Sequence, residues 1–134
     1  MKTKHLSSLL VLIMISLICA CSSKPEELLP GKWQMTGVES SALTSNDAAL
    51  QDYVQDLVKS TSAIYNADFS YEQTVNSITT KGKWTILADG KQLQVVDESG
   101  QKTIMGVVEL TSDRLILNNF DGGVETKQIF TKVK

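Results

Sequence analysis

Apolar and polar residues alternate along most of this chain, which is the pattern of strands that bury one face. The alternation begins at Trp33 and Met35, and it returns in the runs 84–86, 104–110 and 124–133. Residue pairs that favour turns separate these runs about every ten residues, namely Asp89-Gly90, Ser99-Gly100, Ser112-Asp113 and Asp121-Gly122-Gly123. This rhythm predicts a meander of antiparallel strands, folded as a sandwich or as an up-and-down barrel.

The pattern supplies eight candidate strands, at residues 32–39, 67–72, 74–80, 82–88, 91–97, 102–110, 113–119 and 124–132. Eight is the number at which a closed sheet just encloses its own side chains or one small ligand. Closure would also remove the exposed edges that an open meander must protect. We therefore expect an all-β protein, an eight-stranded antiparallel up-and-down barrel.

One segment departs from the alternation and predicts a helix over residues 46–60, inserted after the first strand. Its apolar residues recur at helical spacing, and residues 44–47 offer several N-cap side chains; the apolar residues are Leu50, Tyr53, Val54, Leu57 and Val58. The apolar stripe either packs on the open end of the barrel or forms a lid over a cavity.

The N-terminal residues 1–20 differ in kind from the rest of the chain. A basic start precedes an apolar run of about ten residues, which as a helix of roughly 15 Å is too short for a permanent membrane span. A basic head, a short apolar middle and a small-residue exit are the parts of a secretory signal peptide. The exit, Cys19-Ala20-Cys21, resembles the lipobox of bacterial lipoproteins, which places lipidation on Cys21. The alternatives are an ordinary signal peptide cut near Ala20 and a short anchor that is never cut.

This resemblance implies cleavage before Cys21 and anchoring to a membrane through lipid. Residues 21–30 then read as a solvated tether, followed by one domain at 31–134. Ser22 fits transfer to the outer membrane, and Lys24 with Glu26-Glu27 is similar to the export signal of surface-exposed lipoproteins. A plain hydrophilic linker explains the same residues equally well. We expect an outer-membrane lipoprotein, with surface exposure left open.

Composition removes most catalytic classes. The chain has 134 residues and a net charge of −2, and loss of residues 1–20 leaves a charge of −4. An acidic domain argues against nucleic acid as a partner. The cleavage also removes His5, the only histidine, and Cys19, while Cys21 becomes a thioether. Without histidine or free thiol, the mature chain has no catalytic triad and no His/Cys zinc site. We expect no enzymatic activity, no metal and no cofactor.

Two short motifs carry a resemblance to a known family. The segment 29–35, which holds Gly31 and Trp33, resembles the Gly-x-Trp entry of lipocalin and lipocalin-like domains. The segments 82–93 and 110–117 are similar to the second half of lipocalin-like domains in secreted bacterial lipoproteins. The resemblance implies that Trp33 plugs the closed end of a barrel. Arg114 falls in the predicted turn before the seventh strand, so no arginine is placed to pack on Trp33 as the family's late arginine does.

Two functions remain. Members of this family often bind small molecules, so the resemblance implies a small apolar or amphipathic ligand. The candidate contacts are Trp33, Met35, Trp84, Tyr53 and Leu57. Alternatively, the protein is a structural or interaction lipoprotein that docks on an envelope protein or complex through the outside of the barrel. A cavity of at least about 300 Å³ would favour the first function, and a filled interior would favour the second.

Overall fold

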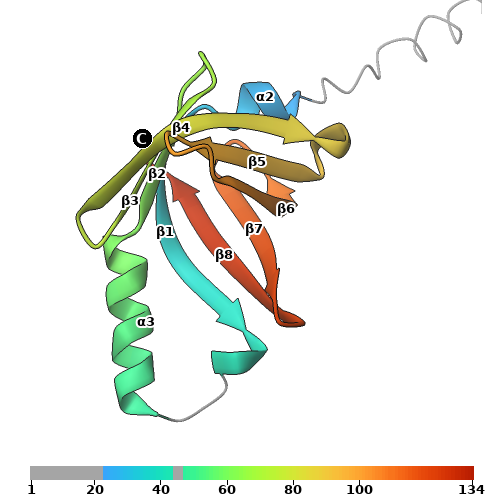
Figure 1. The fold of residues 1–134 in the computed structure, drawn as a ribbon. Coiled ribbons are helices and arrows are strands. Elements are labelled where there is room, and N and C mark those ends of the chain that lie inside the picture. The colour runs from blue at the N-terminus through green and yellow to red at the C-terminus, as the bar shows by residue number, and fades with distance from the viewer. Residues whose placement is uncertain (1–22, 44–46) are drawn as a thin grey trace, which may run out of the picture.

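The computed structural model describes residues 23–43 and 47–134. In this part of the chain, eight strands form a closed antiparallel barrel, in which each strand pairs with the next and β8 pairs with β1 (Figure 1). The strands are β1 (Gly31–Ser40), β2 (Ser62–Tyr65), β3 (Ser70–Val75), β4 (Ile78–Leu87), β5 (Gln92–Asp97), β6 (Lys102–Leu110), β7 (Arg114–Asp121) and β8 (Val124–Lys132). The helical elements are α2 (Pro25–Leu28), η2 (Ser41–Leu43), α3 (Ala48–Ser60) and η3 (Ala88–Gly90).

The predicted fold class, an eight-stranded antiparallel up-and-down barrel with one inserted helix, is confirmed. The expected signal segment, residues 1–20, and the expected lipidation site, Cys21, lie outside the described residues.

The predicted second strand, residues 67–72, is correct only in part, because residues 70–72 lie in β3 but residues 67–69 do not. A strand that was not predicted, β2, precedes β3, with a turn at residues 66–69 between them. The Asp68 carboxylate closes this turn by accepting hydrogen bonds from the Ser70 backbone N–H (2.9 Å) and hydroxyl (2.6 Å). Phe69 lies in the turn with a φ of 67°, and its ring packs on Trp84 with 4.9 Å between the ring centroids. Phe69 therefore belongs to a turn rather than to the predicted strand.

The predicted boundary between the third and fourth strands, near residue 81, is wrong. β3 ends at Val75, a two-residue turn follows, and β4 then runs unbroken from Ile78. Asn76 and Ser77 form this turn with φ values of 49° and 66°. Positive φ at both central residues suits the twist of a hairpin, and glycine is its usual sequence marker. No glycine marks this turn, so the pattern alone placed the break elsewhere.

Inward-facing side chains from the strands form the core of the barrel. The core contains a cluster of aromatic rings, in which the Tyr65 centroid lies 5.3 Å from that of Tyr71 and 6.2 Å from that of Trp84. Such contacts add to the stabilisation from burying large aromatic surfaces. The other buried apolar side chains of this cluster are Leu29, Trp33, Met35, Ala63, Leu93, Val95, Leu115, Leu117 and Phe130. These side chains form one packed cluster inside the barrel, and partly buried side chains such as Ile86, Met105 and Val107 pack against it.

The two ends of the barrel differ, and α2 marks the one we call the closed end (Figure 1). Leu29 is fully buried there, and its carbonyl accepts a hydrogen bond from Trp33 Nε1 (2.8 Å). Lys132 Nζ donates to the Leu28 and Pro30 carbonyls. Residues 25–30, which the sequence suggested were part of a solvated tether, thus pack against the barrel.

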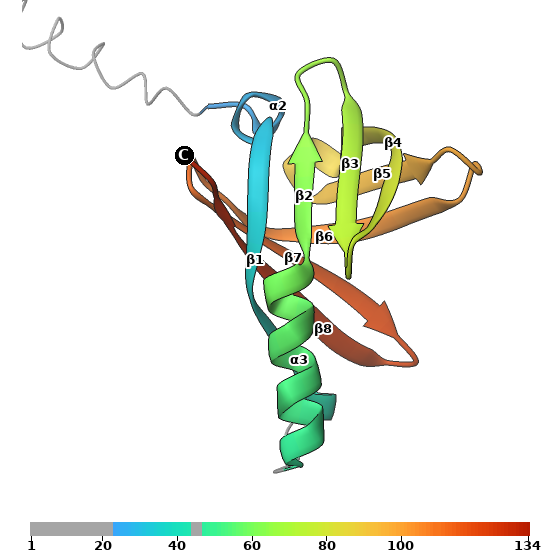
Figure 2. The ribbon, with the colours of Figure 1, turned by 90° about the vertical axis from the view of Figure 1, so that its left-hand side faces the viewer.

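The opposite end, which we call the far end, holds α3 and the tip of the β7–β8 hairpin (Figures 1 and 2). The predicted helix at 46–60 is observed as α3, and the Asp47 carboxylate caps it by accepting from the Ala49 N–H (2.9 Å). α3 packs mainly on β1 and β3 and buries none of its residues. Figure 2 shows it running away from the barrel beside β1, so only its last turns, near Val58, pack against the core.

Candidate functional site

Three of the sequence-predicted ligand contacts lie together inside the barrel. Trp33, Met35 and Trp84 are 0%, 4% and 1% exposed, and all belong to the core cluster. The other two lie on α3, where Leu57 is half-buried and Tyr53 is 61% exposed. The structure therefore unites the first three as core residues and leaves Tyr53 apart from them. Their role as ligand contacts stays a prediction.

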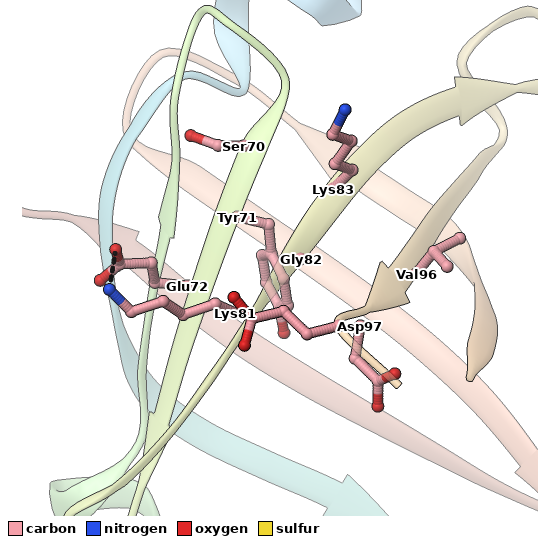
Figure 3. A pocket seen from close by; sticks show the side chains of 9 residues that line it. Ser70, Tyr71, Glu72, Lys81, Gly82, Lys83, Val96 and Asp97 are labelled. Atoms are coloured by element: carbon pink, nitrogen blue, oxygen red, sulfur yellow. Dashed lines mark ion pairs between the residues drawn. The ribbon is translucent and has the colours of Figure 1, made fainter. Parts of the chain in front are cut away.

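A concavity of about 400 Å³ lies in the wall formed by β3, β4 and β5, and we call it the wall pocket (Figure 3). Tyr71 and Trp84 point into the core, so their chain neighbours on the same strands point outward. The pocket is therefore lined from outside the barrel, in two cross-strand rows. One row joins Ser70, Lys83 and Val96, and the other joins Glu72 and Lys81.

Gly82 lies between these two rows and explains why the wall can bend here. It pairs with Tyr71 on β3 and with Asp97 on β5. A Cβ atom at this position would overlap the Val96 carbonyl oxygen and lie 2.8 Å from Asp97 Cα. Only glycine allows the two backbones to approach so closely. The absence of a side chain at Gly82 thus contributes to the shape of the wall pocket.

Two of the charged side chains around the wall pocket, Lys81 and Asp97, have partners within the protein. Lys81 Nζ lies 3.2 Å from Glu72 Oε1, and Figure 3 shows this ion pair along one side of the pocket. The Asp97 carboxylate accepts hydrogen bonds from the Ser99 hydroxyl and from the Ser99 and Gln101 N–H groups. These bonds, led by that of the Ser99 hydroxyl, lower the pKa of Asp97 below its usual value.

Lys83 differs from Lys81, because no ion pair found among the described residues includes it. Its ammonium is exposed at the pocket, and its aliphatic stem lies in the row with Val96. Lysine stems present apolar surface while their ammonium groups stay in water. The wall pocket therefore combines apolar surface with charges of both signs, since Glu98 also lines it and the Lys83 charge acts on the nearby Asp68 carboxylate.

Two further concavities lie at the ends of the barrel. One, of about 350 Å³, lies at the closed end between α2 and β6, where Pro25, Leu28 and Val108 contribute to its lining. The other, of about 290 Å³, lies beside the ends of β1 and β8 and is lined by polar residues such as Glu39 and Lys127.

Within residues 23–43 and 47–134, no group of three or more His, Cys, Asp or Glu side chains is placed to hold a metal ion. None of the helices in the same ranges combines the length and apolar character needed to cross a membrane.

Sequence reasoning missed the wall pocket, although one signal was present. A glycine inside a strand often marks a close backbone approach. The predicted strand break near residue 81 placed Gly82 at the start of a strand, which hid this meaning. The pairing of Lys81 with Glu72, which leaves Lys83 available, depends on cross-strand register and has no marker in the sequence.

The fold is a lipocalin-like barrel, and comparison with solved structures agrees on this fold. The chain is similar to a lipocalin-like protein from Bacteroides uniformis, with a TM-score of 0.56 and 19% identity over 78% of this chain and 98% of that one. It is also similar to a DUF4847 family protein from Bacteroides vulgatus (TM-score 0.56, 14% identity, 81% and 96% covered). A third similar structure, a Bacteroides uniformis protein solved by NMR, has a TM-score of 0.52 and 24% identity (82% and 91% covered). No protein-family model and no curated protein matches the sequence.

Proposed function

We propose that this protein is a lipid-anchored lipoprotein of the bacterial outer membrane whose barrel binds a small amphipathic molecule. The anchoring half rests on the lipobox-like Cys19-Ala20-Cys21 and the short apolar segment before it. Acylation at Cys21 supplies the membrane attachment, since two or three acyl chains hold a protein firmly. The proposal assigns the protein no catalytic activity, no cofactor and no nucleic-acid partner.

The wall pocket is the observation that carries the binding half. Its volume of about 400 Å³ falls in the range of small-molecule sites, and the packed core cluster occupies the adjoining interior. The apolar surface beside Val96 suits a short hydrocarbon part, and the Lys83 ammonium suits an acidic head group. We therefore place the ligand in the wall rather than inside the barrel.

Titration of the ¹⁵N-labelled mature protein with decanoate, a simple amphipathic anion, tests this half. We expect saturable shifts of the amide resonances of Lys81, Gly82 and Val96. Replacing Lys83 with Met should weaken decanoate binding about tenfold, because a charge-assisted hydrogen bond contributes about 1.5–3 kcal/mol. Lys59→Met, at an exposed position of α3 outside the lining of the wall pocket, is the matched control and should leave the affinity unchanged. Shifts confined to other parts of the barrel, or equal effects of both variants, would contradict the assignment.

A second function, docking on an envelope protein, is favoured by the far end of the barrel. Ile78, in the β3–β4 hairpin, is 73% exposed, and Phe120, in the β7–β8 hairpin, is 66% exposed. Exposed apolar side chains of this size are common at protein interfaces. If docking is the function, the double variant Ile78→Ser/Phe120→Ser should lose co-purifying envelope proteins while still binding decanoate. If ligand binding is the function, Lys83→Met should weaken decanoate binding, and the double variant should bind decanoate as the wild type does.

A further inference from the structure

The closed end of the barrel carries a surface next to the point where the chain continues toward Cys21. We infer that this surface rests on the bilayer that holds the anchor, so that the closed end faces the membrane. The surface, which we call the membrane face, consists of Pro25, Leu28, Lys91 and Val108 around the concavity between α2 and β6. The inference rests on the proposed acylation of Cys21.

The first step concerns the length of the connection. α2 begins at Pro25, only four residues after Cys21. Even a fully extended chain spans at most about 3.6 Å per residue, so Pro25 lies within roughly 14 Å of the acylated cysteine. A tether of ten residues would let the barrel tumble freely above the bilayer, whereas this connection keeps α2 at the lipid surface.

The second step is that α2 is fixed to the barrel, so its position sets the orientation of the domain. Lys132 Nζ, on β8, donates a hydrogen bond to the Leu28 carbonyl (2.7 Å). At the first residue of the helix, a Cβ atom at Gly90 would lie 2.7 Å from Pro25 Cγ, so α2 touches η3 directly. With contacts to both β8 and η3, α2 holds the whole closed end near the bilayer.

The third step concerns the chemistry of the surface. Val108 is the extra residue of a β-bulge, because the β6–β7 register shifts between Val107 and Glu109, and its side chain is 50% exposed. The concavity beside it, of about 350 Å³, is lined by apolar side chains of α2 and β6 together with polar ones such as Asp89, Lys91 and Glu109. A surface with apolar and polar parts of this kind can sit in the headgroup region of a bilayer.

Charges on this surface are of both signs, with exposed Lys24 and Lys91 beside exposed Glu26, Glu27 and Asp89. Attraction to anionic lipid therefore contributes little, and the anchor with the apolar contact sets the orientation. Strands of eight to ten residues span about 30 Å, so the far end, with Ile78 and Phe120, points away from the membrane.

Site-specific fluorescence quenching tests this orientation. Loss of residues 1–20 removes Cys19, and acylation blocks Cys21, so an introduced cysteine is the only free thiol of the mature protein. The acylated protein carries one environment-sensitive fluorophore at Val108→Cys or Lys91→Cys on the membrane face. The matched controls are Phe120→Cys and Ile78→Cys at the far end. Each is reconstituted into phosphatidylcholine vesicles that contain a nitroxide-labelled lipid.

We expect the nitroxide lipid to quench labels at 108 and 91 at least threefold more strongly than labels at 120 and 78. Stronger or equal quenching at the far end overturns the inference, and so does absence of quenching at all four positions in protein that floats with the vesicles. The intact mass of each sample and a Cys21→Ala variant test the anchor separately. Protein that lacks lipid at Cys21, or a Cys21→Ala variant that still floats, overturns the proposed anchoring as well.

Discussion

The ammonium of Lys132, on the last strand, lies 4.7 Å from the centroid of the Trp33 ring, on the first strand of the barrel. The same Nζ donates hydrogen bonds to the carbonyls of Leu28 (2.7 Å) and Pro30 (2.9 Å). Partial burial at this point lowers the pKa of Lys132. One lysine thus joins β8, the plugging tryptophan and the segment that leads to α2.

Replacing Lys132 with Met should destabilise the barrel by about 1–3 kcal/mol. The variant keeps the aliphatic stem but loses two hydrogen bonds and a cation–π contact, and it leaves two carbonyls without their donor. Urea unfolding followed by tryptophan fluorescence measures the change. Lys127→Met, on the same strand, is the control and should cost less than 0.5 kcal/mol. Equal losses in the two variants would mean that the contacts of Lys132 contribute nothing specific.

Replacing Gly82 with Ala should destabilise the protein by roughly 1–3 kcal/mol, because the added methyl group overlaps backbone atoms of β5 that cannot move aside. Gly37→Ala provides a matched control in β1. A Cβ atom there lies no closer than 3.5 Å to the Ile129 side chain, an ordinary contact. Thermal unfolding of both variants checks this prediction. If Gly82→Ala is as stable as Gly37→Ala, the backbones of β4 and β5 do not approach at Gly82 as closely as described, and the wall pocket does not have the described shape.

Gln34 helps to fix the end of α3 on the barrel, beside the hydrogen bond from the Ser60 hydroxyl to Asn76 (2.6 Å). Gln34 Nε2, on β1, lies within hydrogen-bond distance of the carbonyls of Val58 (3.2 Å), Lys59 (3.3 Å) and Thr61 (2.9 Å) at the end of the helix. Gln34→Ala should therefore accelerate amide hydrogen exchange in the last turns of α3 by about tenfold, while exchange in β4 and β5 stays as in the wild type. Gln92→Ala, at an exposed position of β5, is the control. Unchanged exchange in α3 would show that other contacts hold the helix.

Alkaline pH should unfold the barrel before its core tyrosines ionise. Burial raises the pKa of Tyr65 and Tyr71 well above the usual 10.0, and in Tyr65 the neighbouring Tyr71 raises it further. A raised folded-state pKa contributes stability that is complete below pH 10 and is lost as the pH rises above it.

Absorbance at 295 nm reports phenolate, and a Tyr53→Phe variant removes the one exposed tyrosine. In this variant, phenolate absorbance should appear only together with loss of the circular dichroism of the folded barrel. Ionisation near pH 10 with an intact spectrum would contradict the packing of these two rings.

The C-terminal half of the fold was predictable because its strands alternate regularly and end at glycine turns such as Ser99-Gly100. β2 escaped prediction because it has only four residues and begins directly after α3. The turn at Asn76 and Ser77 lacks the glycine that usually marks it. In both cases the pairing of a strand with its neighbours in the barrel determines the structure, and the conformational preferences of the local residues do not.

The candidate site was less predictable than the fold. Trp33 and Trp84 were candidates both for core packing and for ligand contact; the structure places both in the core, and their role as ligand contacts stays a prediction. The resemblance implies a late arginine that packs on Trp33. In the structure Lys132 packs there instead, and the sequence analysis did not predict this contact. The wall pocket arises from Gly82 and the register of three strands, and such an approach of backbones can be read only from the folded chain.

Native mass spectrometry of the acylated protein, purified from the membranes of its own host in mild detergent, tests ligand binding most directly. We expect a second charge-state series, heavier by the mass of one small amphipathic molecule and much reduced in the Lys83→Met variant. A single series at the mass of the acylated polypeptide alone, from wild-type protein kept below its unfolding temperature throughout, would contradict the binding function.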